Sequence, residues 1–298
     1  MQLGAMLPLN DLGGEPAVVA DFAVAAERMG YDYLLAADHV LGVNAASRPD
    51  WGNRNTSADL FHDPFVLFGF LAGITSRVGL ASGVLILAQR QAALVAKQAA
   101  SVDRLSGGRL RLGVGIGWNP VEFTALGENF ADRGIRSGEQ VAVMQALWAQ
   151  EHVDFTGRWH RIEDAGINPR PAAGRIPVWF GGHVPATLQR CAKLGDGWMM
   201  LAHPPGQAAL DDFATLRRLT AEAGRDPAAM GIEVWVSPAE GGPAEWRDAI
   251  RFWRDAGVSH ATLAGTYARN HHKRIEGRTL AAHLSALARY RDAVADLL

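Results

Sequence analysis

Two adjacent side chains that can exchange protons, Asp38 and His39, directly follow the apolar run Tyr33–Ala37. A short apolar run predicts a buried strand, and polar groups at the C-terminal end of a barrel strand face the mouth of the barrel. An imidazole there titrates near neutral pH and can donate or accept a proton. The structural alternative makes Asp38 a turn cap and His39 a hydrogen-bonded side chain. We expect both residues to be catalytic.

A glycine interrupts a second apolar run, VGLASGVLIL, at Ser82-Gly83-Val84. Glycine inside a strand indicates a bulge or a close approach of the backbone to another group. A flat ring that stacks on the backbone would need the missing side chain. A simple bulge fits the pattern equally well, so both interpretations stay open.

The segment Gly113–Phe123, GVGIGWNPVEF, combines a glycine-rich strand end with the start of a helix. Asn119 predicts a helix cap, and Pro120 fits the first helical turn. Glu122 falls at the third helical position, so we expect it to complete a capping interaction rather than to act in catalysis. Trp118 fits either a cavity wall or the core. The spacing differs from the dinucleotide fingerprint, because the glycines are Gly113, Gly115 and Gly117.

The segment Val178–Leu188, VWFGGHVPATL, predicts a strand, a double glycine and a helix with Pro185 in its first turn. Free amide groups at a helix N-terminus bind phosphate well, and barrels often place a phosphate site in their later loops. We therefore expect a phosphate site at Gly181 and Gly182, with a plain tight turn as the alternative.

The histidines and the single cysteine form no convincing metal or nucleophile motif. His271 and His272 are adjacent, which places their side chains poorly for one metal ion. Cys191 lies in a helical pattern and is expected to be a small buried apolar residue. The sequence has neither a G-x-S-x-G elbow nor a P-loop. We expect no metal site.

Composition narrows the partners of the protein to small molecules. The formal net charge of −2 comes without a basic block, so neither nucleic acid nor a membrane surface is expected to bind. The start MQLGAMLPLN lacks the features of a secretory signal, and no apolar stretch reaches the roughly 18 residues of a membrane span. One cysteine in 298 residues excludes an intrachain disulfide and favours a reducing cytoplasm.

A recurring pattern of elements positions these residues. An amphipathic stretch ends at Gly30, Gly195 or Gly257, each suited to the left-handed conformation that ends a helix, and a short apolar run follows. Such units predict a parallel sheet of βα pairs. We expect an α/β fold, a (β/α)₈ TIM barrel over residues 1–298 as a single domain, with a doubly wound open sheet as the alternative. The predicted strands are Gln2–Leu7, Tyr33–Ala37, Val78–Leu85, Leu110–Val114, Val178–Phe180, Gly197–Leu201, Ile232–Val236 and Ala261–Ala264.

Three long polar segments interrupt this pattern: Gly42–Asp63, Glu151–Arg175 and Tyr267–Arg278. The second contains VDFTGRWHRI, which predicts a small hairpin around Thr156-Gly157. Long segments in a compact barrel are usually lids or binding loops. We expect all three at the face where barrel enzymes bind their ligands.

Together, Asp38-His39, Ser82-Gly83-Val84, GVGIGWNPVEFTALG and PVWFGGHVPATLQRCAKLGDGW resemble, in this order, the luciferase-like monooxygenase superfamily. The resemblance covers essentially the whole chain. It implies a TIM barrel with loop insertions and a ring cofactor at its C-terminal mouth. Within the superfamily the sequence is most similar to the branch that uses the deazaflavin coenzyme F420 for hydride transfer.

The resemblance also assigns residues to the cofactor. In the F420 branch an Asp-His pair lies beside the ring, and Asp38-His39 match it. A non-prolyl cis peptide bulge supports the ring and would fall within Ser82-Gly83-Val84. Backbone groups near Gly181 and Gly182 would hold the phosphate, and Gly115, Gly117 and Glu122 match the family's loop after the fourth strand. The implied cofactor-binding residues are Asp38, Ser82, Gly83, Val84, Gly115, Gly117, Trp118, Gly181, Gly182 and His183.

One residue departs from the F420 branch. Members that oxidise sugar phosphates carry a catalytic Glu where this chain has Trp118, and they bind the substrate phosphate with lysines that this chain almost lacks. Sugar-phosphate oxidation is therefore not expected. The FMN branch shares the same loops, so FMN stays open as the cofactor.

We expect an oxidoreductase that transfers a hydride between coenzyme F420 and an apolar or aromatic small molecule, with Trp51 and Trp118 as an apolar wall. One alternative is an FMN-dependent two-component monooxygenase that uses O₂ and is supplied by a reductase. Another is a flavin- or deazaflavin-binding protein without catalysis. The resemblance also implies a homodimer, and the apolar helical face around Val141–Trp148 fits packing either within or between subunits.

Overall fold

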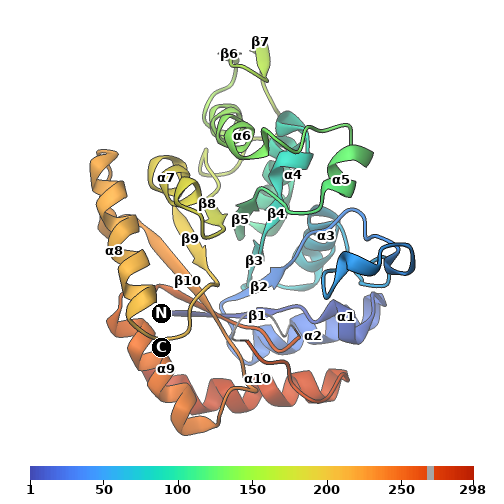
Figure 1. The fold of residues 1–298 in the computed structure, drawn as a ribbon, viewed down its shortest axis with the longest axis vertical. Helices are drawn as coiled ribbons and strands as arrows, with labels where there is room; N and C mark the ends of the chain where they lie inside the picture. The colour runs from blue at the N-terminus through green and yellow to red at the C-terminus, as the bar shows by residue number, and fades with distance from the viewer. Residues whose placement is uncertain (267–271) are drawn as a thin grey trace.

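The computed structural model describes residues 1–266 and 272–298 and has a closed barrel of eight parallel strands at its centre (Figure 1). Around the ring the order is β1, β2, β3, β5, β8, β9, β10 and β11, and β11 pairs again with β1. The short β4 continues the line of β3 and pairs with β5. The barrel strands are β1 (Gln2–Met6), β2 (Tyr33–Ala36), β3 (Gly79–Ser82), β4 (Leu85–Ile86), β5 (Leu110–Gly115), β8 (Val178–Gly181), β9 (Gly197–Met200), β10 (Gly231–Val236) and β11 (His260–Leu263).

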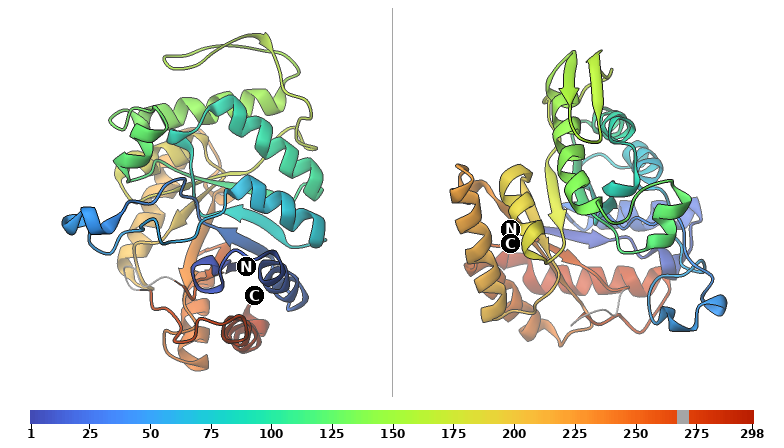
Figure 2. Two further views of the ribbon diagram at one scale, coloured as in Figure 1. Left: turned by 90° about the vertical axis from the view of Figure 1, so that its right-hand side faces the viewer. Right: turned by 45° about the horizontal axis from the view of Figure 1, so that its top comes forward.

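Helices surround the barrel on its outside, and the two chain termini lie close together in all views (Figures 1 and 2). Among the described residues, no helix is both long and apolar enough to cross a membrane. The α-helices are α1 (Leu9–Leu12), α2 (Pro16–Arg28), α3 (Pro64–Ile74), α4 (Ala92–Ser106), α5 (Pro120–Ala125), α6 (Arg133–Ala149), α7 (Pro185–Leu194), α8 (Gln207–Glu222), α9 (Pro243–Asp255) and α10 (Leu280–Val294). Short 3₁₀ turns are η1 (Ala45–Ser47), η2 (Pro49–Trp51), η3 (Leu87–Gln89), η4 (Pro227–Ala229) and η5 (Ala295–Leu297).

All eight predicted strands are present, which confirms the TIM barrel and excludes the open sheet. The predicted third strand, Val78–Leu85, is not continuous. It divides into β3 and β4 because the Gly83–Val84 peptide between them is cis, as the resemblance implied. A regular ladder of hydrogen bonds cannot pass through this bulge.

The predicted helix-ending glycines behave in two ways. Gly30 and Gly257 have φ values of 83° and 82°, which confirms the left-handed conformation. Gly195 has a φ of −89°, so that prediction was wrong. A Cβ atom at Gly195 would lie 2.9 Å from the Phe180 ring. The missing side chain therefore lets the backbone at Gly195 pack closely against Phe180, and it does not serve to reverse the chain.

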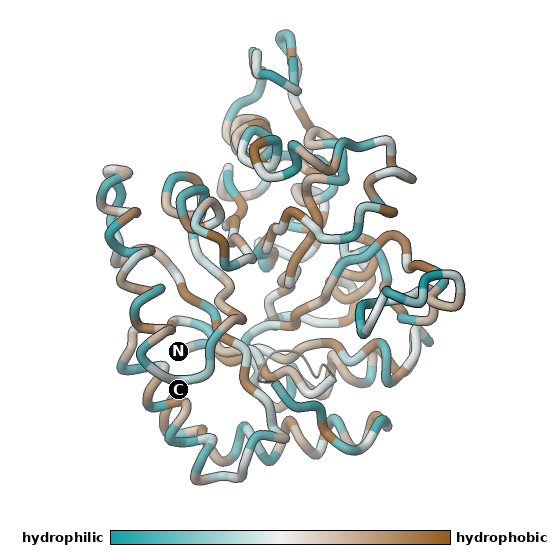
Figure 3. Tube along the Cα trace, viewed as in Figure 1, coloured by the Kyte–Doolittle hydropathy of each residue, from teal (hydrophilic) through white to brown (hydrophobic). Residues whose placement is uncertain are grey.

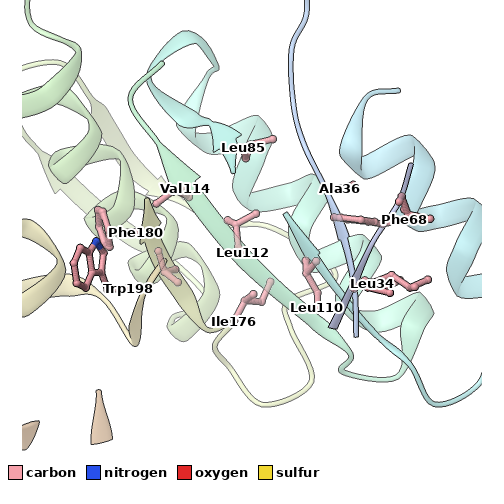
Figure 4. Close-up of a cluster of buried hydrophobic side chains, with 14 of the residues drawn as sticks. Leu34, Ala36, Phe68, Leu85, Leu110, Leu112, Val114, Ile176, Phe180 and Trp198 are labelled. Atoms are coloured by element: carbon pink, nitrogen blue, oxygen red, sulfur yellow. The ribbon is translucent and has the colours of Figure 1, made fainter. Parts of the chain in front are cut away.

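The hydrophobic core fills two layers. The larger one lies between the strands and the helices, where side chains such as Leu34, Leu112 and Trp198 are fully buried (Figure 4). A smaller cluster inside the barrel comprises Met6, Tyr33, Leu35, Ala81, Trp179, Met199 and Ala264. The predicted face of α6 belongs to the larger layer, because Val141, Met144, Leu147 and Trp148 are buried within the chain. This face is therefore unavailable to a second subunit.

The predicted hairpin forms between β6 (Val153–Thr156) and β7 (Arg161–Ala165), which are antiparallel. It extends beyond the helices and carries many hydrophilic residues (Figure 3). The segment joins α6 to β8, so it begins at the N-terminal end of the barrel, and none of its residues lines the cavity described below. The expectation that it belongs to the ligand-binding face was wrong, because α6 returns the chain to the opposite end. Of the predicted loop at 267–278, residues 267–271, including His271, lie outside the described residues.

Candidate active site

A cavity of about 530 Å³ opens at the C-terminal ends of the barrel strands. Its volume falls within the range typical of small-molecule sites. Residues that follow β2, β3, β5 and β8 line it, together with residues from β4, β9 and β10. The predicted site residues on its surface are Asp38, His39, Gly83, Val84, Gly115, Gly117, Trp118, Gly181, Gly182 and His183.

Trp51, predicted as part of the apolar wall, does not line the cavity. Among the predicted cofactor-binding residues, Ser82 is the one that does not line it. Its side chain is fully buried, and its hydroxyl donates a hydrogen bond of 2.8 Å to the carbonyl oxygen of Gly113. This bond joins the end of β3 to β5 directly below the bulge. Ser82 thus fixes the bulge from beneath and is not placed to touch a ligand.

Val84 forms one wall of the cavity, and two glycines make room for it. A Cβ atom at Gly115 would lie 2.5 Å from Val84 Cγ2, and one at Gly181 would lie 2.8 Å from Val84 Cγ1. Both distances are shorter than real Cβ contacts allow. The glycines therefore let the Val84 side chain lie between the ends of β5 and β8, where it forms a small apolar platform.

The double glycine after β8 leads into the N-terminus of α7. Gly182 has a φ of 117°, a conformation that residues with a side chain rarely adopt. Its carbonyl oxygen accepts a hydrogen bond of 2.8 Å from the indole of Trp198, which fixes the turn. The helix α7 begins at Pro185, shortly after the lining residues Gly181, Gly182 and His183.

Asp38 is buried, and its carboxylate contacts two other groups. Its carboxylate forms an ion pair of 2.8 Å with Arg90 and accepts a hydrogen bond of 2.9 Å from the amide of Ile86. Burial raises the pKa of Asp38, and Arg90 opposes this effect. Asp38 therefore joins the ends of β2 and β4.

His39 contacts Glu122 on α5, with 3.0 Å between the ring atom Nδ1 and the carboxylate atom Oε2. The other oxygen, Oε1, accepts hydrogen bonds from the amides of Val40 and Leu41 at 2.7 and 3.1 Å. Asn119 and Pro120 start the helix as predicted. The predicted capping role of Glu122 was wrong, because its carboxylate leaves its own helix and binds the loop after β2.

Aromatic rings surround His39. The Phe61 ring lies 4.9 Å and the Trp118 ring 5.4 Å from the imidazole, centroid to centroid, both in edge-to-face geometry. Trp51 packs on Trp118 at 5.6 Å, and the Arg54 guanidinium lies 4.4 Å from the Trp51 ring. The polar loop Gly42–Asp63 thus contributes Asn55 and Phe61 to the cavity surface.

Comparison with known proteins identifies the family of this site. Residues 3–296 match the luciferase-like monooxygenase family. The chain belongs to this family. Among curated relatives of the luciferase-like protein, the uncharacterized Rv0940c of Mycobacterium tuberculosis is 32% identical over 243 residues, covering 80% of this chain and 81% of that protein. The pyrimidine monooxygenase RutA of Bradyrhizobium is 26% identical over 296 residues, covering 89% of this chain and 79% of RutA.

Two solved structures share the fold of this luciferase-like protein. The monooxygenase RslO1 from Streptomyces bottropensis has a TM-score of 0.80 and 19% identity, with 99% of both chains covered. An F420-dependent secondary alcohol dehydrogenase with an F420–acetone adduct has a TM-score of 0.78 and 17% identity, with 100% of this chain and 99% of the other covered. The solved structures that share this fold thus include both an F420-dependent dehydrogenase and a monooxygenase.

Sequence reasoning missed several residues on the cavity surface of the luciferase-like protein. Met199, Leu201 and Trp235 lie at or just beyond the ends of predicted strands, a position that could have identified them. Phe61 and Asn55 come from the long loop, where no local pattern indicates which residues turn inward. The other missed lining residues are Ala37, Ile86, Ile116 and His272.

The remaining chemical expectations concern Cys191 and metals. Cys191 is buried and unpaired by a disulfide, and burial raises the pKa of its thiol to about 12. It therefore behaves as the predicted small core residue. Over residues 1–266 and 272–298, no group of three or more His, Cys, Asp or Glu side chains is arranged to hold a metal ion.

Proposed function

We propose that the protein transfers a hydride between the deazaflavin coenzyme F420 and a small organic substrate. The observation that carries this proposal is the single cavity in which the Val84 platform, the glycine loops and His39 meet. Backbone and small apolar surface suit the face of a flat ring. When bound, the deazaflavin accepts or donates the hydride at its C5 atom.

His39 is the residue that moves the proton. When a substrate carbon gives up a hydride, the attached oxygen or nitrogen also loses its proton, and the imidazole accepts it. In the reverse direction the imidazole returns the proton as the carbon receives the hydride. Its position on the cavity surface, among aromatic rings that exclude water, supports this role.

The turn Gly181–Gly182 and the start of α7 would bind the cofactor phosphate. Arg190 supports this role. Its guanidinium donates a hydrogen bond of 3.2 Å to the Thr187 hydroxyl, and a Cβ atom at Gly182 would lie 3.2 Å from that same hydroxyl. Burial lowers the pKa of Arg190, and among the described residues no carboxylate pairs with it. The guanidinium is therefore available to an anion beside the turn.

The substrate is proposed to be apolar or aromatic. Phe61, Trp118 and Trp235 present large rings to the cavity, which would gain contact with an apolar molecule. Apart from Asp38, which is paired with Arg90, the lining side chains carry no permanent charge. Binding a charged substrate would cost desolvation free energy, because few groups in the cavity could replace the water molecules around its charge.

The second candidate function is an FMN-dependent monooxygenase that uses O₂ and receives reduced flavin from a separate reductase. The 26% identity with RutA, which is named a pyrimidine monooxygenase, favours this candidate. The same cavity would hold the flavin ring, so cofactor identity must be measured directly.

The decisive experiment is a titration of the purified protein with F420 and with FMN, followed by quenching of cofactor fluorescence. The proposal expects F420 to bind at least about tenfold more tightly than FMN, which is 1.4 kcal/mol. A preference for FMN, with O₂ consumption in the presence of reduced FMN, would support the monooxygenase instead. Tight binding without turnover across a panel of alcohols, aldehydes and enones would indicate a binding protein, and failure to bind either cofactor would overturn the proposal.

We also propose that residues 1–298 act as one domain, as a homodimer, in the reducing cytoplasm. The single cysteine fits that location. The face of α3 suits a dimer, because Val66, Phe70 and Ile74 are spaced four residues apart and are 72%, 39% and 37% exposed. Gly69 and Gly73 on the same helix leave open space for a close neighbour.

A further inference from the structure

The Glu122 carboxylate contacts the His39 ring, although Glu122 itself does not line the cavity. Its side chain is 1% exposed, and it reaches from α5 to the loop that follows β2. The atom Oε2 lies 3.0 Å from His39 Nδ1, while Oε1 accepts the amides of Val40 and Leu41. Three contacts to one short segment hold this carboxylate in a fixed orientation.

These contacts determine the protonation of Glu122. Burial alone would raise its pKa, but the bond to His39 and the amides of Leu41 and Val40 hold the pKa below its ordinary value. Glu122 is therefore ionised near neutral pH, and an ionised carboxylate can only accept hydrogen bonds. The proton of the shared bond must then reside on His39 Nδ1.

We propose that Glu122 is a positioning residue that holds His39 as the Nδ1–H tautomer and leaves the Nε2 lone pair to the substrate. Nε2 makes no hydrogen bond within residues 1–266 and 272–298, and the ring lies on the cavity surface. The inference rests on the proposed function of His39. In that reaction the substrate O–H or N–H bond breaks and an N–H bond forms at Nε2, while the hydride leaves with both electrons of the C–H bond. Glu122 then stabilises the resulting imidazolium.

The other charged groups near His39 are engaged elsewhere. On its own loop, Asp38 pairs with Arg90 at 2.8 Å, and Arg90 also pairs with Asp63 at 2.9 Å. From the long loop, Arg54 packs on the Trp51 ring. His183 and His272 line other parts of the cavity. Glu122 is the one described carboxylate within ion-pairing distance of the His39 ring.

The chain contains a matched copy of this arrangement outside the cavity. Glu139 on α6 contacts His160 Nδ1 at 2.8 Å and accepts the amides of Arg158 and Trp159 at 2.8 and 2.9 Å. Neither residue lines the cavity. The pair Glu139–His160 therefore provides a control in which the same chemistry has no route to the substrate.

The first test measures the ring nitrogens of ¹⁵N-histidine-labelled protein by NMR, with the His39 signals assigned by their loss in His39→Gln. The wild type is expected to show His39 protonated at Nδ1 near neutral pH. In Glu122→Gln the amide NH₂ would face Nδ1, so the proton is expected to move to Nε2.

The second test uses activity with the cofactor that the protein binds. In Glu122→Gln, kcat is expected to fall roughly 10- to 100-fold with cofactor affinity within about twofold. Glu139→Gln is expected to change the His160 signals while kcat stays within about twofold.

The outcomes separate the two proposals. A wild-type His39 protonated at Nε2, or a Glu122→Gln variant with an unchanged His39 tautomer, would overturn the role of Glu122. The first of these outcomes is read from the wild-type protein, so it does not depend on the folding of Glu122→Gln. An Nδ1–H tautomer in a protein that binds neither cofactor would overturn the proposed function while the tautomer assignment stands.

Discussion

At the scale of single residues, two carboxylates of the luciferase-like protein lie near the loop that carries His39, and they have different roles. Asp38 is neutralised by Arg90 and joins strand ends, whereas Glu122 contacts the His39 ring itself. The two neighbours in sequence, Asp38 and His39, thus have different partners in space. In the proposed function, His39 is therefore the group that exchanges a proton with the substrate.

The first prediction concerns His39→Gln. We expect turnover to fall at least about 100-fold with cofactor affinity within about twofold, because the proton acceptor is lost while the cofactor walls remain. The matched control is His160→Gln, which removes a similarly paired imidazole outside the cavity and is expected to leave turnover unchanged. Steady-state kinetics and fluorescence titration measure both effects. Equal turnover in His39→Gln and the wild type would remove His39 from the mechanism.

The second prediction concerns the platform. Gly115→Ala places a methyl group 2.5 Å from Val84 Cγ2, so the valine must move and cofactor binding is expected to weaken roughly tenfold or more. The double variant Gly115→Ala/Val84→Ala removes the clash and is expected to recover part of the affinity. Gly138→Ala on α6 is the control, because its new methyl group meets only ordinary contacts at 3.7 Å. Additive losses in the double variant would contradict this account.

At the scale of elements, hydrogen bonds at the end of the barrel opposite the mouth hold the start of β3. Glu27 near the end of α2 accepts amide hydrogen bonds from Ser76, Arg77 and Val78 at 3.0, 2.7 and 2.8 Å. These bonds fix the start of β3, whose far end carries the Gly83–Val84 bulge. Stability of this connection and chemistry at the mouth are therefore separable.

The third prediction tests this separation with Glu27→Gln. Burial opposes the effect, but the three amides hold the pKa of Glu27 below its ordinary value. A carboxylate whose pKa is lowered by folding contributes stability above its unfolded pKa of about 4.3 and loses that contribution as the pH falls through the folded pKa. We expect Glu27→Gln to lower the free energy of unfolding by about 1–2 kcal/mol at pH 7, and by much less near pH 3.

Denaturant unfolding at several pH values measures this difference. Glu15→Gln on the same helix is the control, because Glu15 is exposed and its side chain caps no amide. The turnover of Glu27→Gln at pH 7 should equal that of the wild type. A stability difference that does not depend on pH would show that the charge of Glu27 is unimportant.

At the scale of the whole molecule, the closed barrel leaves an apolar helix on its outside. The sequence of α3, PFVLFGFLAGI, has no charged residue, and one side of the helix packs into the core through Phe65, Phe68 and Leu71. Val66 on the other side is 72% exposed. A second copy presents the same face, so two chains can cover each other in a symmetric contact.

The fourth prediction is that Val66→Asp shifts the protein from dimer to monomer. Its charge would lie in the contact between two α3 helices, while the folded monomer tolerates it because the position is exposed. Ile135→Asp on α6 is the control, since Ile135 is 70% exposed and lies on another helix. Light scattering after size exclusion gives the molar mass. A wild-type protein that is monomeric at tens of micromolar would reject the dimer.

The sequence by itself determined the barrel and the main parts of the cavity, because both depend on local patterns. Apolar runs between helices predicted the strands, and strand ends of parallel barrels meet at one mouth, so Asp38, His39 and the glycine loops could be placed together. Tertiary structure decided which side chains touch. Glu122 lies 83 residues from His39, and its local position predicted a cap, yet its carboxylate faces another loop. Packing likewise turns Ser82 away from the cavity and Phe61 toward it, and the local sequence pattern predicts neither orientation.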